Sequence, residues 1–209
     1  MVSNITIVVG ASRGIGVELA KHLAQTPGTH VVATMHKGFS LELPNVEVIQ
    51  LDQSKTDSVH AAARKVKEAD TLIVNGAIGE DELLTAHRVV NAFLPPLRVG
   101  NTRRIIYISS TAASLTKQVG EPWGLHGPYA DSKTAGNMLT VQYHKELHDD
   151  GFKVVFIHPG WVATDMGNLA GPGAMPVTES VQKIMEIVNG LSRTDGAKFF
   201  DMDGTTLPW

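Results

Sequence analysis

The sequence predicts an α/β fold in which helices cover both faces of a doubly wound parallel sheet. Short runs rich in β-branched residues alternate along the chain with segments of helical character. The runs are continuously apolar, as expected of strands that are buried on both faces. No repeat or low-complexity linker divides the 209 residues, so we expect a single domain over residues 1–209.

Each element follows from a local pattern. Strands are predicted at residues 5–10, 30–35, 46–52, 71–76, 103–110, 153–160 and 197–204. Helices are predicted at residues 14–25, 54–69, 81–97, 128–149 and 178–190. Pro27 and Gly28 end the first helix, Ser54 caps the second, and the third stops near Pro95 and Pro96. The least regular segments, 111–128 and 161–177, follow carboxyl ends of strands, where such sheets bind ligands.

Composition excludes several classes of function. The formal net charge of −3 argues against nucleic acid or an anionic membrane as partner. No apolar run has transmembrane length, and the N-terminus lacks the basic region of a signal peptide. Cysteine is absent, which excludes disulfides and thiol chemistry. By default we therefore expect a cytoplasmic protein.

A glycine-rich turn, "GASRGIG", joins the first predicted strand to the first helix at residues 10–16. Gly10, Gly14 and Gly16 permit a tight turn and close approach of the backbone, so the helix N-terminus can face a pyrophosphate. The alternative is a purely structural turn. The position between strand and helix favours dinucleotide binding.

The segment "PYADSK" at residues 128–133 places a tyrosine four positions before a lysine. On a helix, Tyr129 and Lys133 share one face. A nearby ammonium favours the phenolate, which helps the phenol to exchange a proton with a carbonyl or an alcohol. The alternative is an ordinary surface pair of Tyr and Lys.

Taken together with Ser110 and "PGWVAT" at 159–164, these motifs resemble the short-chain dehydrogenase/reductase family over essentially the whole chain. The ending "FFDMDGTTLPW" and the "ATMHK" after the second strand resemble the branch with C-factor and sniffer-like carbonyl reductases. The resemblance implies a Rossmann-type fold and reduction of a ketone or aldehyde with hydride from a nicotinamide.

The resemblance also implies a role for each matching residue. Tyr129 is the proton donor, Lys133 favours its ionisation and holds the nicotinamide ribose, and Ser110 orients the substrate oxygen. Asp52 matches the acid that contacts adenine. The implied cofactor-binding residues are Gly10, Ser12, Arg13, Gly14, Ile15, Gly16, His36, Lys37, Asp52, Asn75, Gly76, Ala77, Tyr129, Lys133, Pro159, Gly160, Val162 and Thr164.

The residues after the second strand favour NADP over NAD. Met35 stands where an NAD site places an acid for the ribose 2′-hydroxyl. His36 and Lys37 follow it, and Arg13 lies in the glycine turn, so three potential cations surround the place of a 2′-phosphate. The alternative is that His36 and Lys37 are ordinary loop residues.

Departures from the family pattern leave two further functions open. Only 35 positions separate Asn75 from Ser110, and the family's catalytic Asn has no match there. Glu82 comes closest to its position, either as part of a proton relay or as a simple first-turn acid. The chain could therefore be a nucleotide-binding sensor or scaffold without turnover, or a non-redox dehydratase or isomerase.

Two expectations concern partners and metals. We expect a homodimer formed by the helix at 81–97 and the helix of Tyr129, because "VVNAFLPPL" is more apolar than a solvated face requires. We expect no metal, because His144 and His148 share a helix face without an evident third ligand. Trp161 and Trp123 could cover a substrate or simply pack a loop.

Overall fold

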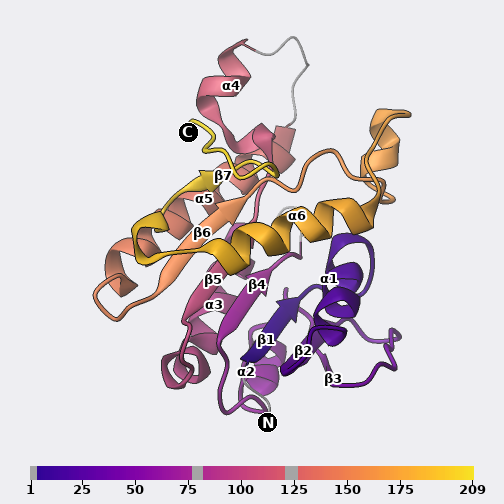
Figure 1. Ribbon diagram of the computed structural model, residues 1–209, viewed down its shortest axis with the longest axis vertical. Helices are drawn as coiled ribbons and strands as arrows, with labels where there is room; N and C mark the ends of the chain where they lie inside the picture. Colours follow the sequence, from indigo (N-terminus) through magenta and orange to yellow (C-terminus); the bar gives the residue numbers. More distant parts are fainter. Residues whose placement is uncertain (1–3, 77–81, 121–126) are drawn as a thin grey trace.

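A computed structural model describes residues 4–76, 82–120 and 127–209 of the chain. In these residues seven strands form one sheet in the order β3-β2-β1-β4-β5-β6-β7 (Figure 1). Every neighbouring pair is parallel, which confirms the predicted sheet. The strands are β1 (Asn4–Val9), β2 (Thr29–Met35), β3 (Val46–Gln50), β4 (Thr71–Val74), β5 (Arg104–Ile108), β6 (Lys153–Ile157) and β7 (Phe199–Phe200).

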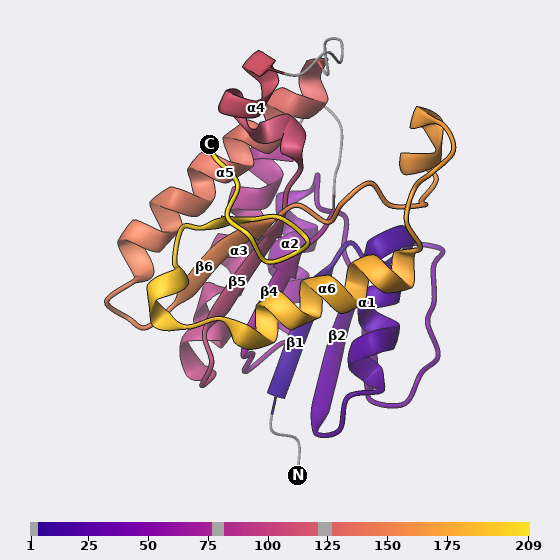
Figure 2. The same ribbon diagram turned by 45° about the horizontal axis from the view of Figure 1, so that its top comes forward.

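Helices cover both faces of the sheet, as the sequence predicts (Figures 1 and 2). The helices are α1 (Gly14–Ala24), α2 (Thr56–Ala63), α3 (Glu82–Val99), α4 (Leu115–Gly120), α5 (Gly127–Leu147) and α6 (Val177–Gly190). Helices α1 and α6 lie on one face, and α2, α3 and α5 lie on the other. The strand order reverses beside β1 and β4, and this switch point is where doubly wound sheets open a crevice for ligands.

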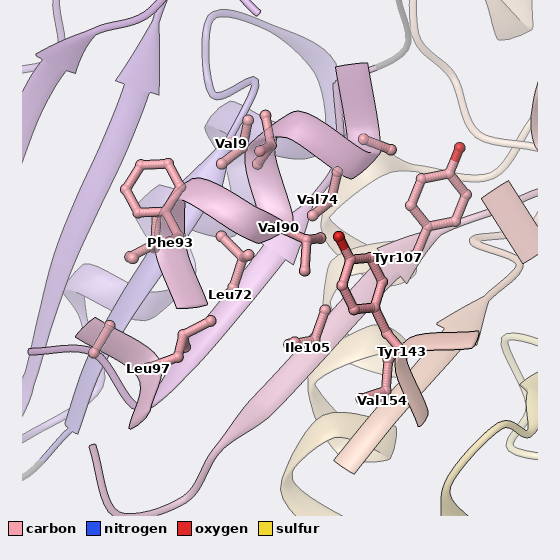
Figure 3. Close-up of a cluster of buried hydrophobic side chains, with 14 of the residues drawn as sticks. Val9, Leu72, Val74, Val90, Phe93, Leu97, Ile105, Tyr107, Tyr143 and Val154 are labelled. Carbon is pink, nitrogen blue, oxygen red and sulfur yellow. The ribbon is translucent and has the colours of Figure 1, made fainter. Parts of the chain in front are cut away.

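Two apolar cores hold the layers together. Successive residues of a strand point to opposite faces, so Leu72 and Ile105 join the core under α2, α3 and α5. Their neighbours Ile73 and Ile106 join the core under α1 and α6. Figure 3 shows the first core, with Phe93 from α3 packed among the strand side chains. Burial on both faces explains why the strand sequences are continuously apolar.

Helix α3 ends two residues beyond the predicted boundary at residue 97. It continues through Pro95 and Pro96 to Val99. A proline in a helix lacks one N–H donor and is unfavourable there. Phe93 and Leu97 on the same helix are fully buried against the sheet, and their burial maintains the helix.

Helix α2 is shorter than the predicted 54–69, and Ser54 does not cap it. The Ser54 hydroxyl instead donates to Asp52 (2.6 Å). The chain leaves the helix after Ala63 because it must reach the sheet at β4, where the Ala69 N–H donates to the Pro96 carbonyl (3.0 Å). Tertiary contacts therefore override the helical pattern of the last predicted turn.

Several predicted strands extend too far at their carboxyl ends. The residues that lie beyond the sheet are 51–52, 75–76, 109–110 and 158–160. Strand β7 spans two residues rather than 197–204, because the chain turns back and the Asp201 N–H donates to the Thr205 carbonyl (2.8 Å). Helix α4 and a preceding 3₁₀ turn, η1 (Thr111–Ala113), arise in a segment that the sequence left irregular.

Two observations bear on partners. No helix in the described part of the chain is long and apolar enough to cross a bilayer. The apolar residues of "VVNAFLPPL" that suggested a dimer are largely used inside the monomer, since Val89, Val90, Phe93 and Leu97 belong to the core.

Candidate active site

A cleft of about 1120 Å³ opens at the carboxyl ends of the central strands. It is lined by residues that follow β1, β2, β3, β4, β5 and β6, together with residues of α1 and α5. Most of the predicted site residues line it: Gly10, Ser12, Arg13, Gly14, Ile15, His36, Asp52, Asn75, Gly76, Tyr129, Lys133, Pro159 and Thr164.

Backbone contacts determine the glycine turn at one end of the cleft. Gly10 and Gly14 have φ values of 85° and 56°, a region that favours glycine. A Cβ atom on Gly16 would lie 2.1 Å from the Gly10 carbonyl oxygen. Gly16 is therefore buried beneath the turn instead of lining the cleft, and its lack of a side chain lets α1 approach β1.

Asn75 fastens the glycine turn to β4. Its side-chain amide donates to the Gly10 carbonyl (3.1 Å), and its backbone N–H donates to the Val9 carbonyl (3.1 Å). A Cβ atom on Gly10 would lie 2.7 Å from the Gly76 Cα. The turn and the end of β4 are thus in direct backbone contact across the switch point.

Of the three potential cations predicted around a 2′-phosphate, His36 and Arg13 line the cleft and Lys37 is not among the described lining residues. His36 follows β2, and its backbone N–H donates to the Ser12 hydroxyl (3.2 Å). Arg13 also lines the cleft and pairs loosely with Asp165 (3.5 Å), both side chains being exposed. Lys37 is exposed in the next turn and is not among the described residues that line the cleft.

Asp52 lies in the loop after β3 and is held as a carboxylate. The Ser54 hydroxyl and backbone N–H both donate to the Asp52 carboxylate. These two bonds, together with the nearby Lys55 ammonium, lower the pKa of Asp52, and burial opposes them with a smaller effect. The Lys55 ammonium lies 3.3 Å from one carboxylate oxygen, and the His36 ring lies 3.8 Å from the same atom.

Tyr129 and Lys133 both line the cleft from the first turns of α5, as their spacing predicts. The Lys133 ammonium lies 5.9 Å from the centroid of the Tyr129 ring and 5.1 Å from that of Tyr107. It donates to the Ile108 carbonyl (3.0 Å), and Lys133 is only 3% exposed. Gly136 allows α5 to lie close to the Tyr107 ring of β5, because a Cβ on Gly136 would lie 2.4 Å from that ring.

Two adjacent serines follow β5 and have different environments. The predicted residue, Ser110, caps η1, and its hydroxyl accepts the Ala112 N–H (3.2 Å). Ser109, which the sequence analysis did not select, lines the cleft and donates to the Asn137 side-chain oxygen (2.6 Å). Ser110 is not among the described lining residues, so its contact with a substrate stays a prediction.

His158, directly after β6, supports the serine segment, and the sequence analysis missed it. Its Nδ1 atom accepts the Thr111 N–H (3.2 Å), next to Ser110. Burial lowers its pKa to about 4, against a raising effect of Asp201. The ring is therefore neutral near pH 7, as an acceptor for that N–H must be.

The segment after β6 closes the other side of the cleft. The Pro159 carbonyl accepts the Ser180 hydroxyl (2.7 Å), and the Thr164 hydroxyl accepts the Gly167 N–H (3.1 Å). Trp161 donates its indole N–H to the Gly167 carbonyl (2.8 Å), which favours its loop-packing role. Two predicted cofactor residues of this segment, Gly160 and Val162, are not among the described residues that line the cleft.

Three predictions fall outside the described residues: Ala77, Trp123 and the side chain of Glu82. The Asn91 side-chain oxygen accepts the Tyr143 hydroxyl (2.8 Å) between α3 and α5. His144 and His148 lie edge to face, with ring centroids 5.0 Å apart. Across the described ranges no three His, Asp or Glu side chains gather as a metal site.

Comparisons with known proteins agree on one family. The family model described as short chain dehydrogenase matches residues 82–173. An uncharacterized oxidoreductase of Schizosaccharomyces pombe is 31% identical over 250 aligned positions, covering 98% of this chain and 97% of the relative. The C-signal protein of Myxococcus xanthus is 39% identical over 123 positions, covering 58% of this chain and 70% of the relative.

Solved structures show the same architecture. The NADPH-bound carbonyl reductase from chicken fatty liver is 27% identical and superposes with a TM-score of 0.89, covering 99% of this chain and 94% of the other. The carbonyl reductase Sniffer of Drosophila melanogaster is 25% identical, with a TM-score of 0.83 and full coverage of both chains (100%).

Proposed function

The chain belongs to the short-chain dehydrogenase/reductase family of oxidoreductases, and from this premise we propose that it reduces a ketone or aldehyde with NADPH. The comparisons also confirm its resemblance to the branch with C-factor and sniffer-like carbonyl reductases. One observation supports the reaction above others: Tyr129 and Lys133 lie together in the cleft that begins at the glycine turn.

The residues around the glycine turn suit a dinucleotide. Gly10 and Gly14 present backbone at the start of α1, where N–H groups and the helix dipole favour a pyrophosphate. Side chains are excluded there by the backbone of Gly76 and by Thr164, whose methyl group lies 3.2 Å from a Cβ position on Gly14. When bound, NADPH supplies the hydride that reduces the carbonyl carbon.

In this proposal Tyr129 donates its phenolic proton to the carbonyl oxygen of the substrate. The buried Lys133 ammonium stabilises the negative charge that remains on the phenol, because opposite charges interact strongly where water is excluded. Ser110 orients the substrate oxygen. Its bond with the Ala112 N–H uses a lone pair of the hydroxyl, so the O–H can still donate to the substrate.

We assign the preference for NADPH over NADH to Arg13 and His36. Both side chains line the cleft after β1 and β2, while Met35 is buried and offers no carboxylate. Among the residues that the structure describes, the partner of the Arg13 guanidinium is Asp165, in an exposed ion pair, and such pairs contribute little stability. A 2′-phosphate can therefore replace Asp165 as its partner. The NADPH in the chicken carbonyl reductase supports the same choice.

The activity is tested by incubating the purified protein with NADPH and a panel of ketones and aldehydes while following the absorbance of NADPH. We expect substrate-dependent oxidation of NADPH and formation of the alcohol. Tight binding of NADPH without turnover of any carbonyl would instead support a sensor or scaffold. Conversion of a substrate without consumption of NADPH would support a dehydratase or isomerase.

We also propose a homodimer in the cytoplasm. Val99 on α3 and Met138 on α5 are exposed apolar side chains on the two helices where we place the contact. Light scattering at micromolar concentration should give twice the monomer mass of 22.4 kDa. A mass near that of the monomer contradicts the dimer.

A further inference from the structure

We propose that the side-chain amide of Gln53 binds the adenine base of the dinucleotide. The sequence analysis did not select this residue. The inference rests on the proposed binding of NADPH and adds to it a contact that recognises the base. Gln53 follows Asp52 in the loop after β3 and lines the cleft.

The amide of Gln53 is buried but incompletely bonded. Gln53 is only 7% exposed, and within the described part of the chain its Oε1 atom has no hydrogen-bond partner. A buried amide oxygen without a donor is unfavourable in a folded protein, so such groups call for an explanation. A ligand that enters the cleft and offers a donor provides one.

The space for this amide is made by Gly76. A Cβ atom at that position would lie 2.0 Å from the Gln53 Nε2 atom and 2.8 Å from its Oε1 atom. The amide therefore lies against the backbone at the end of β4, beside the switch point where the glycine turn meets β4.

The backbone of the same loop is fixed from the side of α3. The Arg88 guanidinium donates to the carbonyl of Gln53 (3.1 Å) and to that of Ser54 (3.2 Å). With its backbone held in this way, Gln53 keeps its amide against Gly76, and both residues line the cleft.

Chemistry favours the base as the ligand of this amide. Adenine offers an exocyclic amino donor beside ring-nitrogen acceptors, and a glutamine amide can pair with both at once. The neighbouring carboxylate of Asp52 is an acceptor only, and it already accepts from Ser54. Gln53 is thus the side chain of this loop that can both accept from the amino group and donate to a ring nitrogen.

The test compares the affinity of NADPH with that of an analogue in which purine replaces adenine, so that the 6-amino group is missing. Both dissociation constants are measured by calorimetric titration for the wild type and for Gln53→Met, which keeps the length of the side chain but removes the amide. We expect the preference of the wild type for NADPH over the analogue to shrink about fivefold in Gln53→Met. Gln50→Met, an exposed residue of β3, is the matched control and should leave the preference unchanged.

Each other outcome overturns the inference in a distinguishable way. An unchanged preference in Gln53→Met, or equal weakening of both dinucleotides, shows that Gln53 does not bind the amino group. Failure of the wild type to bind NADPH overturns the proposed function together with this inference. If thermal melting shows that Gln53→Met does not fold, Gln53→Leu is measured in its place, with the same criterion.

Discussion

The two ends of the cleft are held by different kinds of contact. The first end contains the glycine turn, and there backbone lies against backbone, as between Gly16 and Gly10 and between Gly10 and Gly76. The second end contains Tyr129, and there side-chain hydrogen bonds fix the loops, as between His158 and Thr111. The first end tolerates no added methyl group, whereas the second depends on the chemistry of each side chain.

The backbone contacts at the first end are part of the fold itself, whereas the loops at the second end are where a substrate would be recognised. The segments after β5 and β6 carry strongly exposed apolar side chains, for example Val119 of α4 (92% exposed) and Leu169 (87% exposed). Figure 1 shows these two segments standing out from the sheet on separate sides. The second end can therefore change to suit a substrate while the sheet and the glycine turn stay as they are.

The largest effect is expected at the second end, from Tyr129→Phe. The change keeps the shape of the ring and removes the proton, so turnover should fall ~10²–10⁴-fold while the affinity for NADPH stays nearly constant. Steady-state rates and cofactor titration measure the two quantities. Tyr143→Phe is the matched control on the same helix, since Tyr143 is buried between α3 and α5, and it should retain activity if it folds. More than a tenth of the wild-type rate in Tyr129→Phe would exclude it as the acid.

At the first end, Gly16→Ala should destabilise the protein by about 3 kcal/mol, because overpacking of a close contact forces the backbone to move. The new Cβ would lie 2.1 Å from the Gly10 carbonyl oxygen. Gly190→Ala on α6 is the control, since no atom lies within 4 Å of its Cβ position. Denaturant unfolding compares the two, and equal stabilities would refute the close-packing account of this end.

A pH-dependent effect is expected at the second end, from His158. Burial lowers its pKa from 6.5 to about 4, so the unfolded state binds the proton more readily than the folded state. The stabilising contribution is complete above pH 6.5 and is lost as the pH falls toward 4. At pH 5 the loss should be about 2 kcal/mol.

Thermal melting at several pH values measures this loss, and His158→Asn should show a shallower dependence than the wild type. His60→Asn, on an exposed position of α2, should melt with the wild-type dependence. Parallel curves for the wild type and His158→Asn would show that the Thr111 segment does not depend on a neutral imidazole.

The smallest effect is expected from the cations near the first end. Arg13→Ala should weaken NADPH binding about tenfold and should leave NADH binding unchanged. The expected loss lies at the lower end of the range for a charge-assisted hydrogen bond, because the Arg13 side chain is exposed. Lys37→Ala should change either affinity less than about threefold, because Lys37 lies outside the lining of the cleft. Equal or tighter binding of NADH than NADPH by the wild type would remove the proposed selectivity.

The sequence predicted the sheet well because its signals are local. Apolar β-branched runs and glycines between a strand and a helix fix the class of fold without knowledge of distant contacts. Boundaries failed where distant contacts decide. Helix α3 continues through Pro95 and Pro96 because the sheet buries its neighbouring side chains, and α2 ends early because β4 must begin.

The candidate site was predictable in part for the same reason. Tyr129 and Lys133 lie together because helical spacing alone brings them together. Gln53 and His158 were missed, because their roles depend on residues far along the chain: Gly76 makes room for one, and Thr111 is bonded to the other. The choice between Ser109 and Ser110 likewise depends on how the chain turns into η1.

The most direct test of the proposed reaction uses NADPH that carries deuterium at the transferable position of the nicotinamide. The product of a carbonyl substrate from the panel is then analysed by mass spectrometry and NMR. We predict an alcohol with one deuterium on the carbinol carbon, formed at a much lower rate by Tyr129→Phe. A product without deuterium, or one formed equally fast by Tyr129→Phe, would contradict hydride transfer with Tyr129 as the proton donor.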